Sequence, residues 1–184
     1  TETQQAFDQV ALTPKTVGAF PDVSRRLLIQ SSIDVEAFVR MDLAMVLALE
    51  IDRVGLVGTG SSNQPRGILN TAGIGSVAGG TNGAAPTFDN MVDLETLVSV
   101  ANANIGNLGY LTNAKVRGKL KKTLEASAAG SEKVWMKDNT INGYSATVSN
   151  QVPSDLTKGT ATGICSAIMF GNWADLILGM WSGL

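Results

Sequence analysis

Residues 33–53 read IDVEAFVRMDLAMVLALEIDR and contain neither glycine nor proline. This composition predicts one long helix that starts at Ser31 or Ser32 and has two carboxylates in its first turn, where they stabilise the helix dipole. A helix of about 23 residues is a rod roughly 35 Å long. Because residues 43–49 are apolar on every side of the helix, we expect it to be covered on more than one side.

Shorter elements are expected on either side of this helix. Residues 1–20 lack helical periodicity and include a proline and a glycine, which predicts an extended arm that ends in turns. A short helix is expected at 23–28, with Asp22 as its cap. After the long helix, residues 54–67 form a turn region rich in glycine and serine. Residues 68–85 are expected to form a loop or a weak pair of strands.

Two further helices are expected in the second half of the chain. The first begins at Thr87 or Asp89 and ends at 106–109, and apolar residues recur along it at helical spacing. The second begins at Asn113 as its cap. The apolar face of this second helix is formed by Val116, Leu120 and Leu124.

Short strands account for the remaining apolar runs. Residues 108–112 are expected to form a buried strand between the two helices. The Asn142-Gly143 pair lies between two β-rich runs and is a strong hairpin signal. Further strand-like runs cover 163–170 and 176–181. Together with the helices, these strands predict an α+β fold.

The composition excludes several kinds of chemistry. The 184 residues include no histidine and one cysteine, Cys165, so Ser-His-Asp catalysis, the usual zinc ligand sets and an internal disulfide are ruled out. The formal net charge of -2 lacks the basic footprint of a dedicated nucleic-acid-binding protein. Carboxylate-only catalysis is not excluded. Since no acid–base pair has a supporting set of residues, we expect no enzymatic activity, no cofactor and no metal.

The chain is apolar for its charge content. Hydrophobic residues make up 44% and charged residues only 16%, below the usual quarter. No run reaches the roughly 18 apolar residues of a membrane span, so we expect no membrane partner. This composition predicts a soluble chain whose surface needs partners, against the alternative of an ordinary core with an uncharged polar surface. The chain begins in mid-arm and stops inside an apolar stretch, which we interpret as a fragment lacking both ends.

Two local motifs have competing interpretations. Residues 73–78 match the letters of the dinucleotide motif G-x-G-x-x-A, but the glycine-rich residues 79–83 that follow do not favour the helix that this motif requires. The second motif is a basic cluster on the helix after Asn113, which is either a solvated outer face or a contact for an acidic neighbour or nucleic acid. The cluster consists of Lys115, Arg117, Lys119, Lys121 and Lys122.

Several segments also follow one another in a particular order. An extended Pro-Lys segment precedes a short helix, a serine start and the long helix, which ends in Gly-x-Gly and then Gln-Pro-x-Gly-Ile-Leu. Three shorter pieces come later in the chain. These segments are 12–15, 23–36, 56–69, 110–113, 142–144 with 148–153, and 170–173. From about residue 7 to its end, the chain resembles in this order the major capsid proteins of tailed bacteriophages.

The resemblance implies the tailed-phage capsid fold, which encapsulin nanocompartments share. Residues 1–20 are then part of an extended loop or arm, 21–66 a peripheral domain with the long helix as its spine, and 67–152 an axial domain. Residues 153–184 complete the axial domain and return to the peripheral domain, where the chain is truncated. A ring of identical subunits needs two different complementary surfaces on each subunit, which agrees with the low charge.

The resemblance also implies a function. The chain is expected to be a structural subunit that assembles into pentamers and hexamers of an icosahedral phage or prophage head enclosing DNA. An encapsulin-like shell is the alternative, and a nucleotide-binding enzyme is a remote one. Expected partners are copies of itself, scaffold, protease and portal proteins, and packaged DNA in non-specific proximity. The expected location is the virion, and the host cytoplasm during assembly.

Charged and turn residues of the first third are the candidate subunit contacts. Arg25 and Arg26 beside Asp22 are placed to form ion pairs between subunits, although a solvated helix surface explains them equally well. The candidate interface residues are Pro14, Lys15, Asp22, Arg25, Arg26 and Arg66.

Overall fold

The computed structural model of the chain describes residues 9, 11–30, 34–128 and 130–181. The helices are α1 (Arg25–Gln30), α2 (Val35–Val57), α3 (Phe88–Val100) and α4 (Ala114–Leu120), with short 3-10 helices η1 (Ile68–Asn70) and η2 (Trp173–Asp175). The strands are β1 (Leu108–Thr112), β2 (Thr140–Ile141), β3 (Tyr144–Val148), β4 (Leu156–Lys158), β5 (Ala161–Cys165) and β6 (Ile168–Asn172).

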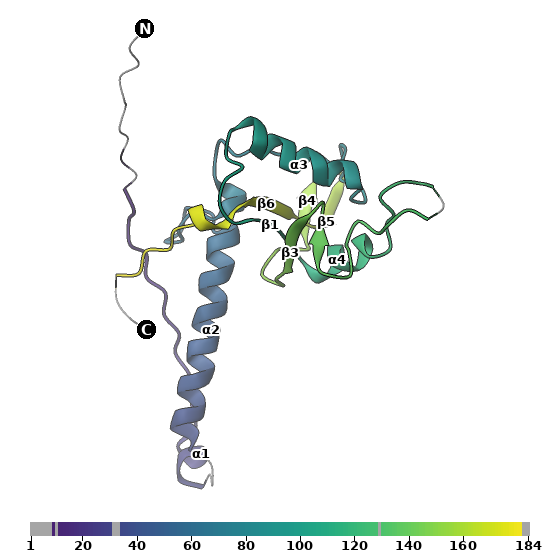
Figure 1. The fold of residues 1–184 in the computed structure, drawn as a ribbon. Coiled ribbons are helices and arrows are strands. Elements are labelled where there is room, and N and C mark those ends of the chain that lie inside the picture. Colours follow the sequence, from purple (N-terminus) through teal and green to yellow (C-terminus); the bar gives the residue numbers. More distant parts are fainter. Residues whose placement is uncertain (1–8, 10, 31–33, 129, 182–184) are drawn as a thin grey trace.

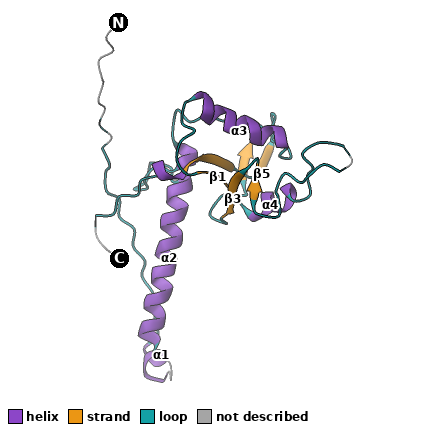
Figure 2. Cartoon of the chain, in the orientation of Figure 1, coloured by secondary structure: helices purple, strands orange, loops and turns teal. Residues whose placement is uncertain are grey.

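The long helix and the sheet form two visibly different parts of the molecule. Figure 1 shows α2 as a rod with α1 at its far end, while the strands, α3 and α4 gather beside its other end. The described residues of the arm, 9 and 11–20, form no helix or strand, as expected (Figure 2). The fold is therefore α+β, with an exposed rod attached to a compact sheet unit.

The long helix α2 is confirmed, with different ends from those expected. Ser31 and Ser32 lie outside the described residues, and the described cap is Asp34, whose side chain accepts a hydrogen bond from Ala37 N at 3.1 Å. The expected end near residue 53 is wrong, because the helix continues through Gly55 to Val57. The Gly58 N–H still donates to the Val54 carbonyl, and the backbone then becomes extended, with ψ 136° at Gly58.

The main sheet has the strand order β2-β3-β1-β6. Strand β1 is parallel to β3 and antiparallel to β6, and Tyr110 is opposite Ala146 on one side and Phe170 on the other. The hairpin expected at Asn142-Gly143 is confirmed between β2 and β3. Both turn residues have positive φ, 49° and 79°, which is the requirement of a type I′ turn. Strands β4 and β5 form a separate two-stranded sheet.

Both α3 and α4 contribute to the core on one face of this sheet. The expected cap of α3 is confirmed at Thr87, which forms a capping box with Asn90, and the cap of α4 is confirmed at Asn113, which accepts from Val116 N at 3.0 Å. The buried residues of this core are Met91, Tyr110, Val116, Leu120, Val134, Trp135, Ile141 and Ala146. Half-buried Tyr144 and Phe170 complete it with edge-to-face and tilted ring contacts to Tyr110.

A second, smaller core joins the end of α2 to the sheet. Leu56 of α2 is buried against Val152 and Met169, and residues of η1 pack around them. Leu56 is the buried hydrophobic residue of α2, whereas the rest of the described rod is half-buried or exposed. The sheet unit is therefore attached to the rod at one end only.

Several expected boundaries are wrong for identifiable reasons. Helix α3 stops at Val100 rather than at 106–109, because Asn102 adopts a left-handed conformation with φ 55°. The bonds from Asn102 N to the carbonyl of residue 99 and from residue 103 N to the carbonyl of residue 98 form a Schellman end. Glycine favours this position, but asparagine also adopts it, so the helix ended before the first glycine.

The remaining corrections concern residues that pair or pack elsewhere. Leu124 is not on the α4 face, because α4 ends at Leu120 and Leu124 forms a β-bridge with Lys133. Residues 176–181 form no strand, and Leu178 lies against Gly55 at the end of α2 instead. For residues 68–85 the loop alternative is confirmed, with η1 at its start, and the weak strand pair is wrong. The expected 163–170 strand is divided into β5 and β6. Asp22 does not cap α1, because that helix begins later, at Arg25.

Alkaline pH is expected to destabilise this core. Burial raises the pKa of Tyr110, whose hydroxyl donates to the Met91 carbonyl at 2.9 Å, and the hydrogen bond to Glu95 raises the pKa of Tyr144. Because both folded pKa values exceed the unfolded value of about 10, their contribution to stability is constant below about pH 10 and falls as the pH rises further. Denaturant unfolding between about pH 8 and 11.5 measures the loss.

Matched variants separate the contribution of the two tyrosines to the alkaline loss of stability from that of lysines, which titrate in the same pH range. Tyr110→Phe removes a buried hydrogen bond and is expected to cost about 1–2 kcal/mol at neutral pH. Tyr110→Phe with Tyr144→Phe should show a shallower alkaline loss than the parent, and Glu95→Gln an intermediate one, since it removes the charge beside Tyr144. Equal slopes in all these proteins would contradict the assignment.

Candidate subunit interface

The predicted interface residues are all exposed, but they lie at two different ends of α2. They are Pro14, Lys15, Asp22, Arg25, Arg26 and Arg66. Asp22, Arg25 and Arg26 belong to α1 and the segment just before it, at the far end of the rod (Figure 1). Arg66 follows the opposite end of α2. The structure thus divides the predicted set into two groups, and their contact with other subunits stays a prediction.

The arm brings Pro14 and Lys15 to the same end of the rod as Arg66. The carbonyl of Thr16 accepts a hydrogen bond from Asn63 Nδ2 at 3.5 Å, so the arm meets the turn after α2. From there the arm continues beside α2, and Val17, Gly18 and Ala19 border a cavity of about 300 Å³ together with residues 46, 47, 49, 50 and 151. Phe20 is 97% exposed at the end of this segment. The arm therefore covers one side of α2.

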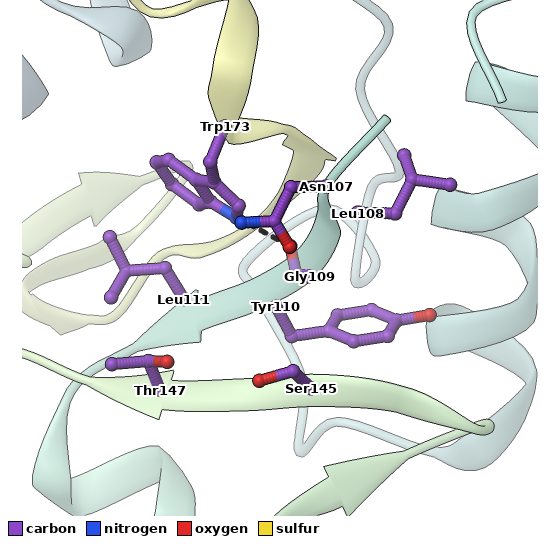
Figure 3. A pocket seen from close by; sticks show the side chains of 8 residues that line it. All are labelled: Asn107, Leu108, Gly109, Tyr110, Leu111, Ser145, Thr147 and Trp173. Carbon is purple, nitrogen blue, oxygen red and sulfur yellow. Dashed lines mark hydrogen bonds between the residues drawn. The ribbon is translucent and has the colours of Figure 1, made fainter. Parts of the chain in front are cut away.

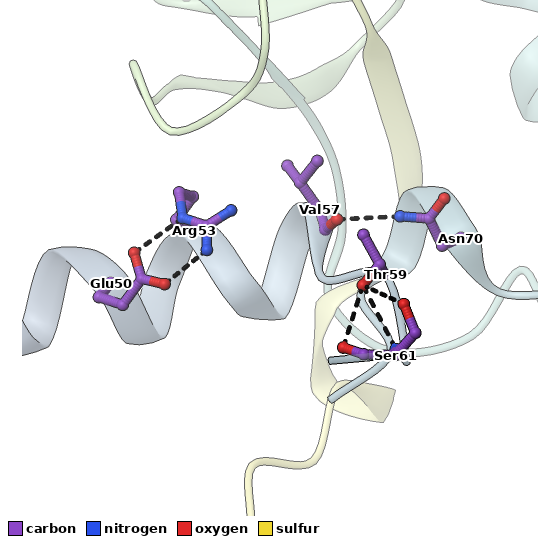
Figure 4. Close-up of polar contacts among 6 residues, drawn as sticks. All are labelled: Glu50, Arg53, Val57, Thr59, Ser61 and Asn70. Atoms are coloured by element: carbon purple, nitrogen blue, oxygen red, sulfur yellow. Dashed lines mark hydrogen bonds and ion pairs between the residues drawn. The ribbon is translucent and has the colours of Figure 1, made fainter. Parts of the chain in front are cut away.

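The turn after α2 is closed by backbone contacts. Gly67 N donates to the Gly58 carbonyl at 2.8 Å, and Thr59 forms a β-bridge with Arg66. The side chain of Asn70 donates to the carbonyls of Val57 and Gly58 at 2.9 and 3.0 Å, which caps the end of the helix. Figure 4 shows the Val57–Asn70 bond and the Thr59–Ser61 contacts beside it. Arg66 is thus held on a rigid turn.

An apolar stripe on α2 is exposed, and none of its residues was among the predicted interface residues. Phe38, Met41, Met45 and Leu49 are 61%, 64%, 59% and 46% exposed. Their spacing of three to four residues places them along one side of the helix. The predicted apolar middle of the helix was the signal for this surface, but our list of interface residues took charged and turn residues instead. We call these residues the apolar stripe.

Ion pairs add little to the rod. Glu36 pairs with Arg40 at 2.6 Å, and Glu50 pairs with Arg53 at 2.5 Å (Figure 4). The hydrogen bond from Arg53 lowers the pKa of Glu50 against a small opposing effect of burial. Both pairs lie within one turn of the helix and are exposed or half-exposed, so each stabilises the helix only slightly. The charges of α2 therefore do not compensate for its uncovered apolar side.

The accessible surface of the whole chain is large. It measures 13204 Å², whereas a compact monomer of this mass exposes about 8,400 Å². Much of the apolar excess among the described residues lies on the rod, on the arm and in the segment after η2, where Ile177 and Met180 are 75% and 70% exposed. A surface of this kind is typical of a chain that is completed by contacts with others.

The opposite face of the sheet contains a second cavity, of about 300 Å³. Figure 3 shows Trp173 above β1, with its indole Nε1 donating to the Gly109 carbonyl at 2.9 Å. Ser145 and Thr147 form the exposed floor beside it. The indole is thus held by the sheet backbone.

The two local motifs have clear structural positions. Gly73–Ala78 lies in a loop that continues without a helix until Phe88, so it lacks the strand–turn–helix context of a dinucleotide site. The cations of the basic cluster are exposed on α4 and the turn that follows it. Neither motif lines the two cavities described above.

The acidic and cysteine side chains of the described residues are scattered. Within residues 9, 11–30, 34–128 and 130–181, no group of three or more cysteine or acidic side chains is placed to hold a metal ion. Among the same residues, no helix is both long and apolar enough to pass through a bilayer. What the described residues do offer is surface for protein contacts.

Comparison with known proteins identifies the family. Residues 1–184 match the phage capsid family over the whole chain, and the chain belongs to this family. It is 37% identical over 175 residues to a protein named major capsid protein from Halomonas phage phiHAP-1. That match covers 95% of this chain but 26% of the phage protein, so the chain spans about a quarter of that relative's length.

A solved structure described as the capsid of an empty GTA particle has the same fold. The TM-score is 0.54 at 22% identity, and the match covers 83% of this chain and 53% of that one. The predicted resemblance and the α+β capsid fold are therefore confirmed. The family is that of capsid proteins, which does not favour the encapsulin-like alternative.

Proposed function

We propose that this chain is part of a major capsid subunit, a structural protein without enzymatic activity, which assembles with copies of itself into the pentamers and hexamers of a phage or prophage head. The observation that carries the proposal is the apolar stripe on α2, which is exposed along roughly 17 Å, about half, of a rod about 35 Å long. An exposed apolar surface of this extent favours contact with other subunits.

The expected division into domains is part of the proposal. Residues 1–20 serve as the arm, 21–66 as the peripheral domain with α2 as its spine, and 67–152 as the axial domain. The pairing of β6 with β1 supports assigning part of 153–184 to the axial domain as well. Pro14, Lys15 and Arg66 at one end of α2, and Asp22, Arg25 and Arg26 at the other, are then two separate contact regions.

The surroundings of the subunit follow from the same proposal. The subunit resides in the virion, reaches it from the host cytoplasm during assembly, and lies near packaged DNA without binding it specifically. The net charge of -2 supports weak rather than tight contact with DNA. Scaffold, protease and portal proteins are further proposed partners.

Electron microscopy of the full-length protein that contains this chain tests the proposal. We expect rings of five and six subunits or closed shells, and sedimentation velocity should show the corresponding large species. The control is the same protein in moderate denaturant, which should dissociate into single subunits. A protein that stays monomeric with its assembly partners present would contradict the proposal.

A further inference from the structure

Charges are segregated within the sheet unit. Between Arg66 and Lys115 the chain contains no lysine or arginine, and the carboxylates of this stretch all lie on α3. Asp89 and Asp93 are exposed one turn apart on that helix. The third carboxylate, Glu95, is half-buried and accepts hydrogen bonds from Asn142 and Tyr144. Asp89 and Asp93 thus form the accessible acidic side of α3.

The opposite sign is concentrated on α4. Lys115, Arg117 and Lys119 are exposed on the helix, and Lys121 and Lys122 continue the cluster beyond its end. In the described part of the chain, the ion pairs are those of Glu36 with Arg40 and Glu50 with Arg53, so none involves a cation of α4. The cluster therefore has no counter-charge within the described subunit.

Each charged surface also has apolar residues close to it. Val100 is 76% exposed and Leu97 is 39% exposed at the end of α3, and Gly75 lies against Leu97. Leu124, 40% exposed, follows the cations of α4. A contact between the two surfaces would bury apolar groups as well as bring opposite charges together, which is the usual composition of a specific protein interface.

Figure 1 shows α3 and α4 apart from each other around the core that they share with the strands. From this arrangement we infer that α4 of one copy docks against α3 of the next copy, with Lys115 and Lys119 facing Asp89 and Asp93. The two surfaces are different, so the contact is head-to-tail, the kind of contact that forms a ring where the rotation between copies closes. The inference rests on the proposed self-assembly and adds which surfaces meet.

Other occupants of the α4 surface are less well supported. DNA would be attracted to the lysines, but the whole chain carries a net charge of -2, and no aromatic side chain alternates with the cations. The carboxylates of α2 are a second counter-surface. Glu36 and Glu50 already pair with arginines of their own helix, whereas Asp42 and Asp52 are exposed and need a direct test. The acidic side of α3 has no such ion-pair partner among the described residues.

Charge reversal on the full-length protein tests the contact. K115E/K119E makes both surfaces acidic, and D89K/D93K makes both basic, so neither protein should form rings alone. Mixed in equal amounts, the two proteins are complementary at every contact, but only when they alternate around the ring. An alternating ring requires an even number of chains. The mixture should therefore form hexamers and no pentamers in electron microscopy, while the parent forms both.

Controls separate this inference from the proposed function. D42K/D52K reverses two exposed carboxylates of α2 and leaves α3 and α4 intact, so it should form rings alone, and in a mixture it should not bring K115E/K119E into closed rings. Thermal melting of each variant must match that of the parent, because Asp89 lies in the first turn of α3. Three outcomes would each overturn the inference. The first is pentamers in the mixture of K115E/K119E with D89K/D93K, and the second is ring formation by K115E/K119E with D42K/D52K instead. The third is loss of DNA binding as the only effect of K115E/K119E.

The α3–α4 contact can still be tested if the parent protein forms no ring. In that case the proposed function fails, but K115E/K119E and D89K/D93K should still associate at low salt, where neither associates alone. Sedimentation velocity at about 0.05 and 0.5 M salt measures this, because ionic screening weakens such a contact. Absence of the mixed complex at low salt overturns the inference.

Discussion

Gly67→Ala is expected to prevent the turn after α2 from closing and to cost about 3 kcal/mol or more of folding free energy. A Cβ atom at this position would lie 2.5 Å from Gly58 N, 2.6 Å from Val57 N and 2.7 Å from the carbonyl carbon of Leu56. All three are backbone atoms of the helix end, so no side-chain rotation relieves the clash. The φ of Gly67 is -85°, which any residue adopts, and the cost is therefore steric.

Denaturant unfolding measures this loss, and Gly118→Ala is the matched control. Gly118 lies inside α4 with no atom within 4 Å of the added Cβ. Its replacement should therefore stabilise the protein by about 0.5–1 kcal/mol, as alanine does in a helix interior. Gly58→Ala should behave like Gly67→Ala, because its Cβ would lie 2.2 Å from the Pro65 carbonyl oxygen. Similar stability of Gly67→Ala and Gly118→Ala would contradict the close approach of the two backbones.

These two glycines mark the limit of what local sequence reasoning predicts. The caps at Thr87 and Asn113 and the Asn142-Gly143 hairpin were predicted because each depends on a few neighbouring residues. The packing of Gly58 on Gly67 depends on how two distant backbone segments meet. The sequence predicted a glycine-rich turn there, but it did not predict that the turn has no room for a side chain at these two positions.

The same distinction explains the wrong boundaries. Leu124 has the spacing of an α4 residue, but pairing with Lys133 takes it out of the helix. Residues 176–181 have the composition of a strand, but a strand needs a hydrogen-bonded partner, and they have none among the described residues. In each case a contact with a distant segment, or its absence, decided the outcome.

The sequence predicted that the surface would contact other subunits, but it did not predict which residues of α2 are exposed. Sparse charge and an all-round apolar helix predicted that the surface needs partners, and the exposure of α2 agrees with this. Our choice of individual residues favoured charges, because spacing alone does not show which side of α2 the arm covers. The structure places Val17, Gly18 and Ala19 beside residues 46, 47, 49 and 50. Leu49, at the end of the apolar stripe, thus lies next to the arm, whereas Phe38, Met41 and Met45 stay open.

Met45→Asp is expected to abolish assembly while leaving the subunit folded. Met45 lies in the middle of the apolar stripe and is 59% exposed, so an aspartate there should change the free energy of unfolding by no more than about 0.5 kcal/mol. In a shell contact the same carboxylate would be buried without a partner, which costs several kcal/mol at each interface. Sedimentation velocity and electron microscopy measure assembly, and denaturant unfolding measures the subunit.

Two control substitutions at methionines test whether the effect of Met45→Asp depends on the exposure of Met45 in the isolated subunit. Met45→Leu keeps an apolar side chain of similar volume and should assemble like the parent. Met91→Asp places the same charge at a position that is 1% exposed, so it should unfold the subunit itself. If Met45→Asp instead lowers the free energy of unfolding as Met91→Asp does, the stripe is covered within one subunit. If Met45→Asp assembles normally, the stripe lies outside every contact, and the observation that carries the proposed function is lost.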